Sequence, residues 1–243
     1  MNLFLNKNFS KLFYLIIFFS FFFQNEITIQ DTNSYINNIY KRPFLYPFLI
    51  NIFELISDNF FLKFLSIFQL ILGYFSIIYF SFFFIKKFEI KNIFYQILLI
   101  FTIAYPYLGI STKLGLTIFS ESIGYPLLLL FSVYFIKNYF FFKFLKRKKY
   151  FIYLMILFSL MVLNKKTFLI VFPLLILAEL NNLILKRKIK IFILNVLLIF
   201  GVFFTINILE RTNSYFKSGV FKPISVGGSS LITAPFYLAT DED

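Results

Sequence analysis

Few residue types in this chain can do chemistry. Cys and His are absent from all 243 residues, so disulfides, thiolate nucleophiles, imidazole bases and the usual zinc ligands are excluded. Any reaction must therefore use carboxylates, hydroxyls, lysines or arginines. The first extensive polar segment, QDTNSYINNIYKRPFLYPF at residues 30–48, supplies Asp31 together with Lys41 and Arg42.

These three residues also have plain structural interpretations. An Asp side chain accepts hydrogen bonds from the N–H groups of a first helical turn, so Asp31 can cap a short helix through TNSYINNIY. Lys41 and Arg42 can contact lipid headgroups. The polar segment alone does not decide between a cap and a reactive group.

Glu121 is the second carboxylate with two interpretations. It falls about five residues into the apolar stretch at residues 116–136, where a charge is costly and usually marks a functional site. If the helix begins later, Glu121 instead lies at the membrane interface beside Ser120 and Ser122. Both alternatives stay open at this point.

The elements that must position these residues are membrane helices. Hydrophobic residues make up 60% of the chain, charged residues only 14%, and the mean hydropathy is +0.82. Soluble domains have roughly 45–50% apolar residues. Trp is absent, so the 16 Tyr must form the interfacial aromatic belt. The composition predicts an all-α, polytopic helical membrane protein.

Apolar stretches indicate about seven transmembrane helices, because a bilayer core needs about 20 helical residues. Lys7 and Lys11 precede the first stretch, and no small-residue cleavage site follows it, which favours an uncleaved anchor over a signal peptide. The second half of the first loop, PFLYPFLINIFELIS, predicts an interfacial amphipathic helix. The seven stretches are residues 9–23, 64–85, 93–108, 116–136, 150–163, 167–185 and 189–209.

The charges predict the orientation. With a cytoplasmic N-terminus, 15 basic residues and two acidic ones, Glu89 and Glu179, fall inside, against nine of each sign outside. The whole net charge of +13 therefore lies on one face, as the positive-inside rule requires. This asymmetry explains the lysine excess without nucleic acid as a partner. It predicts a transmembrane domain at residues 1–209, an extracytoplasmic loop at 24–63 and an extracytoplasmic polar tail at 210–243.

Lys165 and Lys166 lie in a tight hairpin, LNKKT, on the predicted outer side. Basic residues there run against the positive-inside trend. Their position favours a functional role over a purely topological one.

Three segments carry a resemblance to the C-type glycosyltransferases. DTNSYINNIYKRPFLYP resembles the first periplasmic loop of several bacterial branches of that superfamily, with an acidic residue, then Tyr, then a basic residue before P-x-LYP. TIFSESIGYPLLLLFSVYF is similar to the acidic start of their fourth span, and the polar tail at residues 210–243 resembles that of an uncharacterised branch. The resemblance implies a protein of the bacterial inner membrane and cell envelope.

The resemblance also implies a reaction, the transfer of a sugar from a polyprenyl-phosphate donor to a lipid, glycan or protein acceptor on the extracytoplasmic side. A carboxylate would orient or deprotonate the acceptor hydroxyl, and cations would stabilise the departing phosphate. Asp31 and Glu121 are the catalytic candidates in this hexosyltransferase reading. The phosphate-binding candidates are Lys41, Arg42, Lys165 and Lys166.

The sequence also departs from that family. Many members have paired acids in the first loop, whereas this loop has a single Asp31, with Glu26 five residues earlier. Members often have more spans and a soluble C-terminal domain, so the DED end suggests a truncated or minimal chain. The terminal Asp241, Glu242 and Asp243 form either a solvated tail or a divalent-cation site.

Two other classes of function remain. A transporter or flippase of lipid-linked sugars would also use basic groups and an intramembrane Glu, although such proteins usually show internal repeats and none is evident. A non-catalytic membrane subunit would need none of these polar residues.

Overall fold

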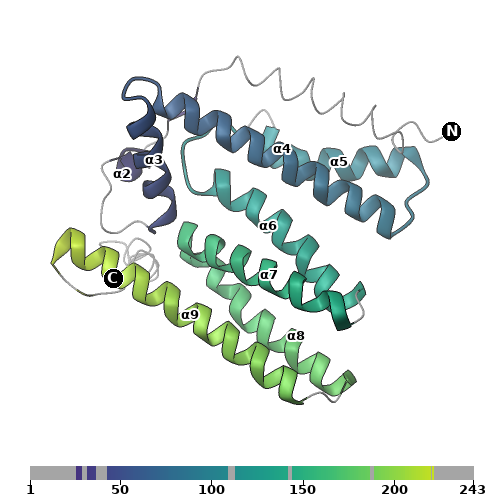
Figure 1. Ribbon diagram of the computed structural model, residues 1–243. Helices are drawn as coiled ribbons and strands as arrows, with labels where there is room; N and C mark the ends of the chain where they lie inside the picture. The colour runs from purple at the N-terminus through teal and green to yellow at the C-terminus, as the bar shows by residue number, and fades with distance from the viewer. Residues whose placement is uncertain are drawn as a thin grey trace, which may run out of the picture. The chain divides into compact units, whose positions relative to one another are not determined.

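The computed structural model describes residues 26–28, 32–36, 43–108, 113–141, 144–186, 189–219 and 221 (Figure 1). The predicted first span, Asp31, Lys41, Arg42 and the residues after 221 lie outside these ranges. Among the described residues the regular structure is helical, and extended pairing is limited to one parallel bridge between Ile27 and Thr117.

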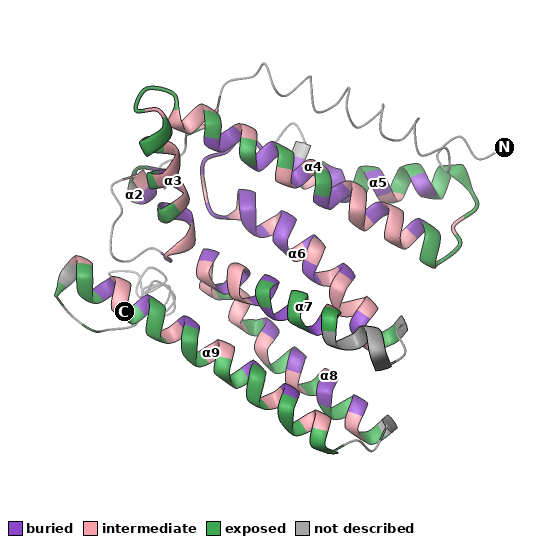
Figure 2. Cartoon of the chain, in the orientation of Figure 1, coloured by how far each residue is buried: buried purple, intermediate pink, exposed green. Residues whose placement is uncertain are grey.

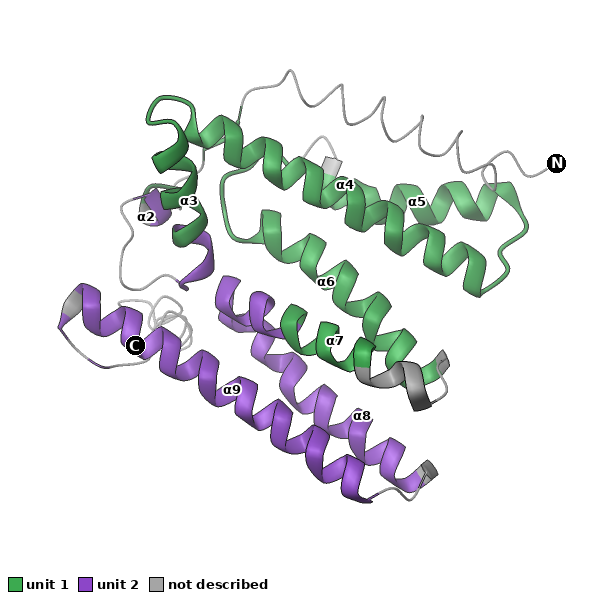
Figure 3. Cartoon of the chain, in the orientation of Figure 1, with its two compact units in different colours: residues 1–33, 48–157 green, residues 34–47, 158–243 purple. Residues whose placement is uncertain are grey.

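The chain forms two compact units, which Figure 3 shows in separate colours. Unit 1 contains residues 1–33 and 48–157, and unit 2 contains residues 34–47 and 158–243. The short helix α2 (Thr32–Ile36), α3 (Leu45–Ile56) and α7 (Phe144–Asn164) each contribute residues to both units. α2 starts directly after Asp31, and α3 covers most of the stretch predicted to form an interfacial helix.

Unit 1 is built around the long helix α4 (Phe61–Lys87), which packs against α6 (Glu121–Ile136) and α5 (Ile93–Leu108). The π-helix η1 (Lys137–Phe141) extends α6. The buried positions of α4 are largely small or polar, a composition that lets membrane helices approach closely. These buried positions include Ser66, Gln69, Gly73, Ser76 and Ser81.

Unit 2 contains an antiparallel helical hairpin. The 3₁₀ helix η2 (Lys166–Ile170) leads into α8 (Val171–Lys186), and α8 packs against α9 (Ile189–Ser218). The ring of Phe172 on α8 contacts the rings of Phe200 and Phe203, with centroids 5.3 and 4.8 Å apart. Aromatic contacts of this kind hold the two helices together along their apolar faces.

Much of the apolar surface is exposed, as expected for helices that face lipid. Figure 2 shows buried residues concentrated along α6 and exposed ones along α9, where Phe204 is 60% exposed. Among the described residues, four helices are long and apolar enough to cross a membrane: Phe61–Lys87, Glu121–Phe140, Lys166–Ile184 and Ile189–Lys217. Three shorter apolar helices correspond to the interfacial segment and to two further predicted spans.

Several helix ends differ from the predicted spans, and α7 begins at Phe144 instead of residue 150. α6 begins at Glu121 and not at residue 116, because residues 116–118 make backbone hydrogen bonds to Ile27. The predicted sixth span begins as a 3₁₀ helix at Lys166. α9 continues past Leu209 to Ser218, so the first part of the predicted polar tail is helical.

Candidate functional site

The segment that leads into α6 in unit 1 is tied to the beginning of the first loop. The N–H of Ile27 donates to the carbonyl of Leu116, and the N–H of Ile118 donates to the carbonyl of Ile27, both at 2.9 Å. These bonds form the parallel bridge to Thr117. They fix the chain before Asp31 against residues 116–118.

Thr32 makes the second attachment of this loop. Its hydroxyl donates to the carbonyl of Ile118 at 2.9 Å, and the residue is fully buried at the first position of α2. The chain is therefore held on both sides of Asp31 by the same short segment. Asp31 itself, including its predicted cap, lies outside the described residues.

Glu121 is the first residue of α6, three residues after Ile118. This placement agrees with the later helix start and with a carboxylate beside Ser120. The hydroxyl of Ser120 donates to Glu121 Oε2 at 2.9 Å, and Glu121 is half-buried. The helix N-terminus stabilises the negative charge, because the unpaired N–H groups there carry a partial positive charge.

The Glu121 segment is rigidly supported. The hydroxyl of Ser122 donates to the carbonyl of Thr117 at 2.5 Å, and the phenol of Tyr107 donates to the carbonyl of Ser122 at 3.1 Å. A Cβ atom at Gly115 would lie 2.8 Å from Tyr107 Cε1, so glycine is needed for this close approach. These contacts fix the backbone that carries Glu121.

The second polar region lies in unit 2, where the structure gives Lys166 a carboxylate partner. Lys166 Nζ lies 2.9 Å from Glu210 Oε2, and the Glu210 side chain is almost fully buried. Lys165 precedes η2 in an extended conformation and is half-buried. The charge of Lys166 is thus balanced by a carboxylate of the same chain.

Glu210 was missed by the sequence reasoning, which placed it in the polar tail. The sequence feature that could have indicated a role for Glu210 is its position directly after the long apolar stretch at residues 189–209. Its partner Lys166 is 44 positions away in the sequence, and no local pattern reveals that pairing. The pair joins the start of η2 to the last third of α9.

Glu179 is a buried carboxylate that the charge count assigned to the cytoplasmic side. The structure places it in the middle of α8, where it accepts a hydrogen bond from Asn195 Nδ2 at 3.0 Å. The sequence feature that could have predicted this buried position is the presence of an acidic residue inside the apolar stretch at 167–185. The pair crosses between α8 and α9 and gives the hairpin a polar contact.

An aromatic cage surrounds Lys137 in unit 1. Lys137 Nζ donates to the hydroxyl of Tyr79 and lies 4.5 Å from that ring centroid, with further rings at 5.1, 5.5 and 5.9 Å. Cation–π attraction stabilises a lysine held in this way without a carboxylate. The three further rings belong to Phe83, Tyr134 and Tyr150.

Within the described parts of the chain, no group of three acidic side chains could hold a metal ion. The suggested divalent-cation residues Asp241, Glu242 and Asp243 lie outside those parts. The carboxylates that remain for chemistry in the described residues act singly or in pairs with Ser, Asn and Lys.

No protein-family model, curated protein or solved structure matches this chain.

Proposed function

We propose that the protein is a membrane glycosyltransferase, which moves a sugar from a polyprenyl-phosphate donor to an acceptor hydroxyl on the extracytoplasmic side. The observation that supports this proposal best is the double attachment of the first loop. Ile27 and Thr32 both bond to residues 116–118, which lead directly into Glu121. Thr32 directly follows Asp31 in the sequence, so the proposal pairs Asp31 with Glu121.

The proposed chemistry needs one proton transfer and one bond exchange. The acceptor hydroxyl gives its proton to a carboxylate, and its oxygen forms a bond to the anomeric carbon of the sugar. The bond from that carbon to the phosphate oxygen breaks, and the lipid phosphate leaves with the bonding electrons. Asp31 is the proposed base, and Glu121 orients the acceptor from the start of α6.

Cationic side chains would stabilise the departing phosphate. Arg42 suits this role because its planar guanidinium can bind two oxygens, and Lys41 adds a point charge. Lys165 is a further candidate. Lys166 contributes less than the sequence predicts, since Glu210 already balances its charge.

The proposal includes the orientation that the charges predict. Seven crossings, a cytoplasmic N-terminus and an extracytoplasmic C-terminus would place Asp31, Glu121 and Lys165 on one side of a bacterial inner membrane. A transporter of lipid-linked sugars is the second candidate function. The buried Glu179–Asn195 pair favours it, because intramembrane acids often mark transport pathways.

The test compares sugar transfer by wild type, Asp31→Asn and Glu121→Gln at matched membrane levels. Loss of a general base lowers the rate by about 100- to 10,000-fold, so Asp31→Asn should lose nearly all transfer of labelled sugar from a polyprenyl-phosphate donor. Its stability should barely change, since Asn is nearly as good an N-cap as Asp. Glu121→Gln should lower transfer less, because an amide can still accept the bond from Ser120.

Glu54→Gln provides the matched control, because Glu54 is exposed on α3 within the same predicted loop. Equal transfer by wild type and Asp31→Asn would leave Asp31 as a helix cap. Absence of transfer by every protein would favour the transporter.

A further inference from the structure

The last two turns of α9 carry their polar side chains on the buried side. Glu210, Asn213, Ser214 and Lys217 are spaced i, i+3, i+4 and i+7, so they share one face of the helix, here called the polar face. Glu210 and Ser214 are buried, whereas Asn213 and Lys217 are half-buried.

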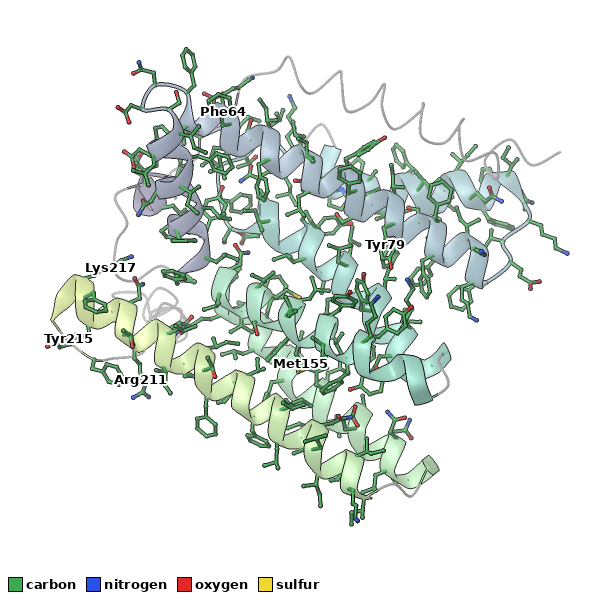
Figure 4. All side chains as sticks on the ribbon, viewed as in Figure 1. Phe64, Tyr79, Met155, Arg211, Tyr215 and Lys217 are labelled. Atoms are coloured by element: carbon green, nitrogen blue, oxygen red, sulfur yellow. The ribbon has the colours of Figure 1, made fainter. Side chains whose placement is uncertain are left out.

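The opposite side of the same turns is exposed and partly apolar. Leu209, Tyr215 and Phe216 are 48, 53 and 81% exposed. Figure 4 shows Arg211 and Tyr215 on the side of α9 opposite Lys217. This polarity is reversed from that of a helix at the surface of a soluble protein, where polar residues face outward. It is the arrangement of a membrane helix whose polar residues face the protein interior.

Two atoms of the polar face are buried and unpaired. Glu210 uses Oε2 for Lys166, but its Oε1 has no hydrogen-bond partner among the residues that the structure describes. Asn213 Nδ2 likewise has no hydrogen-bond partner among the described residues. One atom is an acceptor and the other a donor, and they belong to residues one helical turn apart.

An unpaired buried polar atom destabilises a folded protein, so each such atom calls for an explanation. Lys166 does not satisfy the second oxygen, because its contact is with Oε2 and Oε1 is without a hydrogen-bond partner among the described residues. An acceptor and a donor on adjacent turns of one helix are the groups that a ligand with neighbouring hydroxyls would satisfy.

We propose that Glu210 and Asn213 bind hydroxyl groups of the sugar on a lipid-linked donor. One sugar hydroxyl donates to Glu210 Oε1, and a neighbouring hydroxyl oxygen accepts from Asn213 Nδ2. Lys166 holds the carboxylate by its other oxygen and so directs Oε1 to the ligand. The identification of the ligand as a lipid-linked sugar rests on the proposed function.

The charges of the region fit a neutral polyol better than an ion. A phosphate would be repelled by the Glu210 carboxylate, and a cation would have to compete with Lys166 for it. Sugar hydroxyls both donate and accept, so they can pair with a carboxylate and an amide without adding charge.

The test measures binding to the full chain in lipid nanodiscs, without sugar-based detergents. The probes are short-chain isoprenyl phosphates carrying glucose, mannose or N-acetylglucosamine, with the sugar-free isoprenyl phosphate as reference. Wild type should bind at least one sugar probe about tenfold or more tightly than the reference, because hydrogen bonds to a charged group are among the stronger ones. Asn213→Leu should lower this preference about three- to tenfold, and Glu210→Gln should lower it further.

Protein stability separates ligand binding from a structural role. Asn213→Leu removes a buried donor that has no partner among the described residues, so its melting temperature should stay equal or rise while the sugar preference falls. Asn207→Leu is the matched control on the same helix, since Asn207 Nδ2 already donates to the carbonyl of Phe203 at 2.9 Å. It should leave the preference unchanged.

Two outcomes would overturn the inference: a wild type with no preference for any sugar probe, or a preference that survives in both Asn213→Leu and Glu210→Gln. The outcome for the proposed function is separate. If wild type prefers a sugar probe, the variants lose that preference and no protein transfers sugar, the binding site at Glu210 and Asn213 is supported. The same result rejects the proposed glycosyltransferase activity.

Discussion

The phenol of Tyr107 shows how closely the helices of unit 1 approach one another. Its hydroxyl shares its one proton between the carbonyls of Gln69 on α4 and Ser122 on α6, and its ring lies beside Gly73. A Cβ atom built on Gly73 would lie 2.0 Å from Tyr107 Cε1. One aromatic residue therefore links the three helices that position Glu121, and the glycine is required for that contact.

Gly73→Ala should consequently destabilise the protein although alanine favours helices. Overpacking of this kind costs about 1–3 kcal/mol, and the ring cannot move without losing two buried hydrogen bonds. Thermal unfolding in detergent measures the change. Gly201→Ala on α9 is the control, because nothing lies within 4 Å of its added carbon, and it should be neutral or stabilise by up to about 1 kcal/mol. A melting temperature of Gly73→Ala equal to wild type would disprove the close contact.

At the scale of elements, the buried pair of Glu179 and Asn195 joins the two helices of the α8–α9 hairpin. Glu179→Leu and Asn195→Leu should each destabilise unit 2 by about 1–3 kcal/mol, since each removes the buried hydrogen bond between the two side chains. The double variant should recover most of the loss, because replacing both partners by apolar groups of similar shape is nearly neutral. A double-mutant cycle of unfolding measures the coupling. Additive losses would mean that the two side chains do not interact.

The elements were only partly predictable from the sequence. Long apolar runs located α4, α5 and α9, because hydropathy depends on the local sequence alone. The start of α6 was not located, since residues 116–118 are as apolar as the helix that follows but bond to Ile27, about 90 positions earlier. The Lys166–Glu210 pair was missed for the same reason, as the partners meet only after the helices pack.

Over the whole molecule, composition predicted a helical membrane protein. That class is supported by four helices, within the part of the chain that the structure describes, that are long and apolar enough to cross a bilayer. Seven crossings and their orientation stay predictions. Charge in the loops decides orientation during membrane insertion. The loop attachments through Ile27 and Thr32 link distant segments of unit 1 whichever way the chain is oriented.

Orientation is testable because the chain contains no Cys, so any introduced thiol is the only one. With 15 basic residues against two acidic ones on the predicted cytoplasmic side, Lys146→Cys should resist membrane-impermeant thiol labels in intact cells. Asn33→Cys should react, since Asn33 is exposed on α2 in the predicted extracytoplasmic loop. Lys87→Cys and Tyr215→Cys, at exposed ends of α4 and α9, test each side a second time. After permeabilisation all four should label. The reverse labelling pattern in intact cells would mean that the orientation is opposite to the predicted one. Glu121, Lys165 and the polar face of α9 would then lie on the cytoplasmic side, where the proposed donor does not present its sugar.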